Sequence, residues 1–180
     1  MDAEPSLLAC PVVPTDPDRD VTLTHLSGAQ HPLDDWLTTF HLAVVVLDPY
    51  TYESAWVLET AGKILEHFRG ASVRNAFVLT CDEADAKRFL GPWADRILTF
   101  VDPDRKFVEV CGLESLPALV HLRQDLVIEA AAQGWDPMEW RAIGHEVARE
   151  RNWTRPTIPA PRDPDPFPGS PAMGRTAQEA

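Results

Sequence analysis

The sequence predicts an α/β domain with a mixed β-sheet flanked by helices. A β-α-β pattern, a hairpin pattern and a final helix follow one another along the chain, and this order is typical of that class. Its 180 residues suffice for one sizeable core. Four prolines fall in residues 1–20 and seven in 155–171, against six between them. We therefore expect an extended N-terminal arm (1–20), one domain (21–153) and a proline-rich C-terminal tail (154–180).

The β-α-β unit rests on two apolar runs of strand length. The run His41–Leu47 is continuously apolar and rich in β-branched residues, as expected for a central strand covered on both faces. Asp48-Pro49 ends it, and Thr51 can cap a helix that continues to Phe68. Residues 75–80 form the second apolar run. The two strands should be parallel and joined by a right-handed crossover.

The other elements follow from shorter patterns. Residues 33–37 have helical spacing of apolar side chains, and residues 118–122 and 126–130 flank a polar break of hairpin length. Asp136, Pro137 and Glu139 form a capping box that opens a last helix. We also expect a short helix over 83–90, a strand over 96–101 and a helix over 104–111.

Composition narrows the classes of partner. The net charge of −12 repels phosphate backbones and anionic lipids, so nucleic acid and membrane surfaces are poor partners, and no segment is apolar enough to insert into a membrane. Cys10, Cys81 and Cys111 are odd in number and lie in no CxxC or Cys/His cluster. We therefore expect no disulfide scaffold, metal or cofactor, and a cytoplasmic location.

Two motifs resemble the thioredoxin fold. Residues 44–56 match the family's run from the central strand through an aromatic residue into the first helix, and residues 113–120 match its turn and cis-proline. The resemblance extends from Leu33 to Arg151. It implies a cis Leu116–Pro117 bond and a groove that receives an extended peptide. The groove residues that it implies are Tyr50, Thr51, Tyr52, Glu53, Ser54, Leu116 and Pro117.

The sequence departs from the thioredoxin pattern at the redox positions. Thr51 and Ser54 stand where the family has its two cysteines, and a hydroxyl cannot replace a thiolate in disulfide exchange. The same stretch resembles the peroxiredoxin Thr-x-x-Cys loop, with Ser54 at the peroxidatic position. A serine nucleophile would need a general base, and no histidine lies in an informative motif. We therefore expect no catalytic residue at this loop.

A redox-inactive thioredoxin-like protein should act by binding other proteins. We expect an assembly chaperone or an accessory subunit of a larger complex, such as a redox or respiratory one. The helix over 33–37, the absent CxxC and the acidity are similar to those of hydrogenase-maturation chaperones of the HyaE/HupG type. The acidic surface favours a basic partner. The alternative is a one-cysteine thiol peroxidase or thiol transferase that uses Cys81 or Cys111.

The proline-rich tail is expected to dock along a partner. Ile158 and Phe167 would be its apolar anchors, and Arg155 and Arg162 could pair with carboxylates. Removing everything after Trp153 should then leave the stability of the domain nearly unchanged.

The six tryptophans divide into two groups. Trp36, Trp56 and Trp140 fit helix faces and should be core residues, whereas Trp93 and Trp135 stand in loops as either lids on the core or binding anchors.

Overall fold

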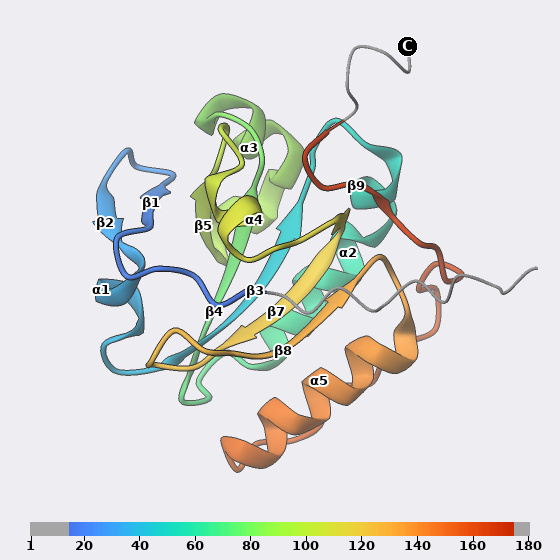
Figure 1. Cartoon of the computed structure of the whole chain (residues 1–180). Helices are drawn as coiled ribbons and strands as arrows, with labels where there is room; N and C mark the ends of the chain where they lie inside the picture. The colour runs from blue at the N-terminus through green and yellow to red at the C-terminus, as the bar shows by residue number, and fades with distance from the viewer. Residues whose placement is uncertain (1–14, 175–180) are drawn as a thin grey trace, which may run out of the picture.

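The computed structural model describes residues 15–174, so most of the expected N-terminal arm, including Cys10, lies outside the described residues. The main sheet has seven strands in the order β2-β1-β5-β4-β3-β7-β8 (Figure 1). Their bounds are β1 Thr22–His25, β2 Gln30–Pro32, β3 His41–Leu47, β4 Val73–Leu79, β5 Leu98–Val101, β7 Ala118–Leu122 and β8 Ile128–Gln133.

The expected pairings are confirmed in the middle of this sheet. Strand β3 is parallel to β4 and antiparallel to β7, with His41 opposite Val73 and Ala43 opposite His121. Strands β7 and β8 form the predicted hairpin. The sheet is therefore mixed, as the fold class requires. The pair β1–β2, which the sequence analysis did not identify, extends it beyond β5.

Helices cover both faces of the sheet. The helices are α1 Leu33–Leu37, α2 Tyr52–His67, α3 Glu83–Leu90, α4 Lys106–Val110 and α5 Pro137–Glu150, with a 3-10 helix over Gly91–Asp95. Side chains of β3 alternate between two cores: Val45 packs in one core with residues of α2, α3 and α5, and Val44 packs in the other with residues of α1 and α4. This alternation explains the continuous apolar run of β3, because neither face meets water.

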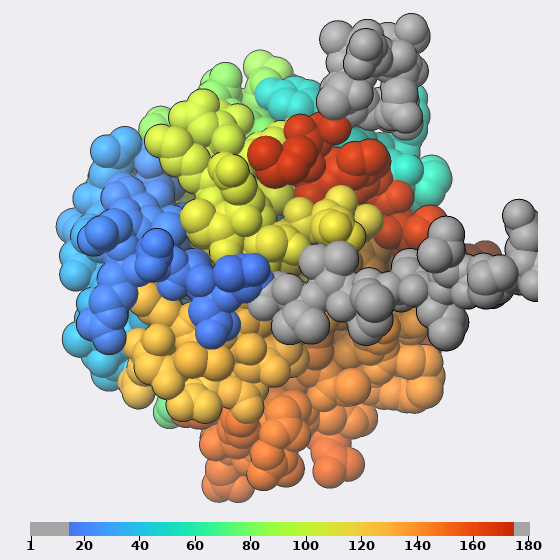
Figure 2. Space-filling view, viewed as in Figure 1, coloured from blue at the N-terminus to red at the C-terminus, as the bar shows by residue number. Residues whose placement is uncertain are grey.

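The C-terminal segment, residues 154–174, packs against the domain, which corrects the expected free tail. Ile158 is 3% exposed and belongs to the core of α2 and α5. A Cβ added to Gly144 of α5 would lie 3.3 Å from its Cδ1 atom, so segment and helix are in close contact. Figure 2 shows the segment in red, lying against the body of the molecule.

The four residues predicted to anchor the tail to a partner differ in their burial. Ile158 is buried, and the backbone of Phe167 pairs with that of Trp135 through two hydrogen bonds of 2.8 and 3.0 Å. Only Arg155 and Arg162 are exposed. The prediction that Ile158 is free to anchor a partner is wrong, because an apolar side chain on a segment tethered beside a core gains more by joining it than by facing water. Phe167 is only partly buried against the same core, and its anchoring role stays a prediction.

Two of the tryptophan predictions are settled by burial. Trp135 and Trp93 are buried, so they are lids on the core. Trp56 is 57% exposed, so its assignment to the core is wrong. It lies on α2, but on the side that faces away from the sheet.

No helix among residues 15–174 is long and apolar enough to cross a membrane.

Candidate functional site: the loop after strand β3

The loop after β3 uses its two hydroxyls to build the start of α2. The Thr51 hydroxyl donates to the Asp48 carbonyl at 2.9 Å and accepts from the Ser54 backbone N–H at 3.4 Å, which makes Thr51 the N-cap. Ser54 is fully buried, and its Oγ accepts from the Asp48 backbone N–H at 2.9 Å. Thr51 thus satisfies a backbone N–H that the helix start leaves unpaired, and Ser54 satisfies a backbone N–H of the loop before the helix.

A buried ion pair holds the same loop from the other side. The Asp48 carboxylate is 2.8 Å from the Arg105 guanidinium and accepts from the Tyr50 backbone N–H at 3.0 Å. The side chains of Asp48 and Arg105 are only 4% and 15% exposed. A pair this buried would leave an uncompensated charge if either partner were removed. The loop is therefore rigidly fixed to the N-terminus of α4, where Arg105 lies.

Tyr50 projects from the loop towards α3. Its hydroxyl donates to Asp85 at 2.5 Å, and this hydrogen bond is the main reason why the pKa of Tyr50 is raised to about 12. The ring is 65% exposed. Tyr50 therefore presents an aromatic face to solvent from a fixed position.

At the place of the predicted groove, the protein's own C-terminal segment packs along the Leu116–Pro117 turn. The Leu116–Pro117 bond is cis, as predicted, and Leu116 is fully buried. Strand β6 (Ser115–Leu116), directly before this proline, pairs antiparallel with β9 (Ser170–Pro171). We call residues 169–174 the strap. An extended segment lies where the resemblance places a bound peptide.

The strap is held by several independent contacts. The Ala172 backbone N–H donates to the Glu114 carbonyl at 2.8 Å, and the Ala172 carbonyl accepts from Arg105 at 2.5 Å. Gly169 has φ +87°, and a Cβ there would lie 2.6 Å from the Leu116 carbonyl oxygen, so only glycine fits. The same Arg105 thus binds both the loop and the strap.

Between loop and strap an open cavity of about 500 Å³ remains. It brings together all the predicted groove residues of the loop except Ser54, whereas Leu116 pairs with the strap and neither it nor Pro117 lines the cavity. Its lining residues are Asp48, Tyr50, Thr51, Tyr52, Glu53, Arg105, Ser170, Pro171, Met173 and Gly174.

A cluster of aromatic side chains begins at Tyr52, which lines this cavity. Tyr52 is 79% exposed and stacks on Trp56 with ring centroids 6.4 Å apart. Trp56 in turn meets Phe167 edge-on at 5.6 Å. Large exposed aromatic side chains that stack on one another are enriched at protein-binding surfaces. Their clustering was not evident from the sequence, because it depends on the packing of the C-terminal segment.

The two cysteines that the structure describes are buried. Cys81 is 2% exposed, and burial, reinforced by Asp82 and Asp85, raises its pKa to about 12. Cys111 is fully buried, and burial raises its pKa as well. A reactive thiol needs the opposite environment, which is electropositive and partly open to solvent.

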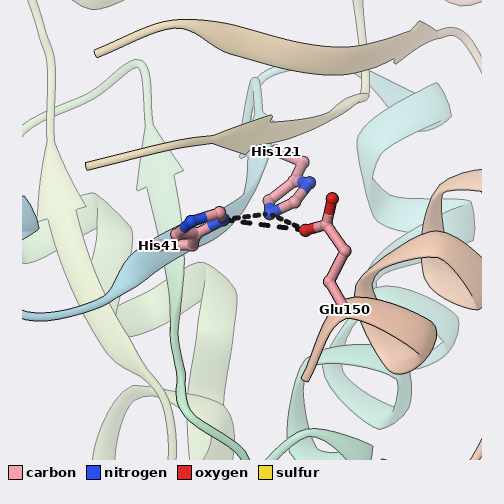
Figure 3. A group of neighbouring side chains, drawn as sticks. All are labelled: His41, His121 and Glu150. Carbon is pink, nitrogen blue, oxygen red and sulfur yellow. Dashed lines mark hydrogen bonds and ion pairs between the residues drawn. The ribbon is translucent and has the colours of Figure 1, made fainter. Parts of the chain in front are cut away.

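A second cluster of titratable groups lies at the other end of β3 and was missed by the sequence analysis. Figure 3 shows His41 of β3, His121 of β7 and Glu150 of α5 pointing towards one another. Burial lowers the pKa of His121 to about 4 and also lowers that of His41, which favours the neutral form of both rings. No sequence pattern could have found this cluster, because its members are 80, 29 and 109 residues apart.

Comparison with solved structures shows the fold. A thiol:disulfide interchange protein DsbE from Chlorobium tepidum aligns with TM-score 0.62 and 14% identity over 76% of this chain and 96% of its own. A secreted Mycobacterium tuberculosis disulfide oxidoreductase homologous to E. coli DsbE aligns with TM-score 0.57 and 17% identity over 72% and 96%. Peroxiredoxin Q from Xanthomonas campestris gives 0.58 and 12% over 73% and 89%.

These likenesses establish that the chain has a thioredoxin-like fold, as predicted. No protein-family model matches the sequence, and no curated protein matches it either. One of the structural neighbours is secreted, so the cytoplasmic location stays a prediction.

Proposed function

We propose that this protein is a non-catalytic thioredoxin-like module that binds another protein, as an assembly chaperone or as an accessory subunit of a larger complex such as a redox or respiratory one. The observation that carries the proposal is the hydrogen bonding of the Thr51 and Ser54 hydroxyls. At the two redox positions their hydroxyls are engaged with backbone groups, and Ser54 has no access to solvent. A likeness to hydrogenase-maturation chaperones of the HyaE/HupG type would fit this role.

The strap supports an extended peptide as the form of the partner. Strand β6 already accepts an antiparallel strand, and the residues there are small or have no backbone N–H to donate: Gly169, Ser170, Pro171 and Ala172. Backbone pairing of this kind is how an exposed sheet edge binds a peptide. A partner segment with small side chains could replace the strap at β6 and extend over the cavity.

The exposed aromatic side chains supply the affinity in this proposal. Tyr52 and Trp56 lie beside the cavity on α2, where a bound segment would cover them. Aromatic residues of this kind contribute a large share of the binding energy at interfaces. The net charge of −12 favours a basic segment and a salt-dependent association rate.

The experiment is co-purification of partners by the tagged full-length chain from its native source. Trp56→Ala should reduce recovery of a specific partner several-fold. Phe40→Ala is the matched control, because Phe40 is an exposed aromatic at the opposite end of β3. Equal recovery with both variants, or no specific partner with the wild type, would count against the proposal.

The thiol-based alternative is favoured by the neighbours, whose names describe disulfide oxidoreductases and a peroxiredoxin. It would require Cys81 or Cys111 to leave the buried, acidic or apolar environment described above. Peroxide consumption and insulin reduction should be measured for the wild type, Cys81→Ser and Cys111→Ser. Turnover that one of these substitutions abolishes would establish the alternative.

A further inference from the structure

The cluster of His41, His121 and Glu150 has the dimensions of a metal centre. His41 Nδ1 lies 3.1 Å from His121 Nε2, and Glu150 Oε2 lies 3.8 Å from the first atom and 3.9 Å from the second. Around a tetrahedral zinc ion, neighbouring ligand atoms are about 3.4 Å apart. The three observed separations lie on either side of this value. A point equidistant from the three atoms is about 2.1 Å from each, the length of zinc–nitrogen and zinc–oxygen bonds.

Three different elements bring the donors together. His41 is the first residue of β3, His121 lies within β7, and Glu150 is the last residue of α5. The register places Ala43 opposite His121, so the two histidines are diagonal neighbours on adjacent strands. The strand backbones position both histidines, and Glu150 reaches them from the end of α5. The geometry is therefore largely built before any ion binds.

A positive side chain now lies beside these donors. Arg151 Nη2 lies 3.1 and 3.2 Å from the two ring nitrogens of His41 and 3.4 Å from Glu150 Oε2. Its Nε atom has no hydrogen-bond partner among the described residues, and its side chain is 21% exposed. It can turn outwards to solvent without breaking any contact outside the cluster that the structure describes. Arg151 thus supplies the positive charge beside these donors, and a bound metal ion could supply that charge in its place.

We propose that His41, His121 and Glu150 form a binding site for a divalent transition-metal ion, with Zn²⁺ as the best fit, in exchange for Arg151. Two imidazoles and one carboxylate are a donor set that suits zinc and leaves a fourth position open. The side chains of His41 and Glu150 are 14% and 19% exposed, so water can reach that position. The ion would join the end of α5 to the sheet, at the end of β3 opposite to the cavity, and the site is independent of the proposed protein-binding role.

The test uses the full-length protein, freed of metal with a chelator, and Zn²⁺ or Co²⁺ alone as the probe. Calorimetry and metal analysis after dialysis should give one equivalent bound. Bound Co²⁺ should show the intense visible absorption of a tetrahedral site without thiolate charge-transfer bands. His41→Ala and Glu150→Gln should each weaken binding by at least about tenfold. Arg151→Gln, which keeps the ligands and removes the competing charge, should tighten it several-fold.

His145→Ala is the matched control, because it removes a histidine from the same helix but outside the cluster. It should leave the affinity unchanged. Circular dichroism identifies variants that fail to fold, and Glu150→Gln keeps the proposal testable if His41→Ala is one of them. No binding by the wild type, thiolate bands in the cobalt spectrum, or equal affinity of Glu150→Gln and His145→Ala would each overturn the proposal.

Discussion

Ile158→Ala measures how far the C-terminal segment belongs to the core. The side chain is 3% exposed and touches the core of α2 and α5 across Gly144. Truncating a buried isoleucine to alanine costs about 2 to 5 kcal/mol of the free energy of unfolding, including the cavity that it leaves. A loss of about 3 kcal/mol in a protein of this size lowers the Tm by roughly 6 to 12 °C.

Thermal unfolding followed by circular dichroism, together with urea unfolding, provides the measurement. The control is Thr157→Ala, one residue earlier and exposed, which should change the free energy of unfolding by no more than about 0.5 kcal/mol. Truncation after Trp153 should destabilise the protein more than Ile158→Ala does, in contrast to what a free tail predicts. If Ile158→Ala melts within about 2 °C of Thr157→Ala, the segment contributes nothing to the core and the reasoning fails.

Three further predictions concern the loop and the thiols. Ser54→Ala leaves the buried Asp48 N–H unpaired and should cost about 1 to 3 kcal/mol in urea unfolding, whereas a mere surface role would cost nothing measurable. In a Cys10→Ser background, Cys81 and Cys111 should react with a disulfide reagent only after denaturation; rapid labelling of the native protein would contradict their burial. Absorbance titration should show Tyr50 ionising near pH 12, and Asp85→Asn should lower its pKa towards 10. Because the folded-state pKa is raised, this hydrogen bond stabilises the protein below pH 10, and its contribution is lost as the pH rises towards 12.

Local patterns predicted the centre of the fold correctly. The apolar run of β3, the Thr51 cap and the Asp136 N-cap each act within a few residues, and the structure has all three where the sequence indicated. The reciprocal hydrogen bond from Glu139 that a full capping box requires is not among those of the described residues. The cis bond before Pro117 came from the thioredoxin motif and is also confirmed. These features are predictable because backbone geometry and nearby side chains suffice to determine them.

Long-range packing explains what the sequence analysis missed. Proline density predicted an extended C-terminal segment, but it cannot tell whether the segment packs on its own domain or on a partner. That outcome depends on matching surfaces such as Gly144 against Ile158, which lie on different elements. Likewise Trp56 has helical spacing with core residues, yet α2 turns it outwards beside Phe167.

The strap constrains the proposed protein-binding role. In that role, the strap paired with β6 would compete with any external strand, and it would do so at the high effective concentration of a tethered segment. A weak, non-specific peptide would not displace it. A partner must therefore bring contacts beyond backbone pairing, and the aromatic side chains of Tyr52 and Trp56 lie where such contacts could form. This competition favours one dedicated protein partner over many extended peptides, which is the specificity that an accessory subunit or a dedicated chaperone needs.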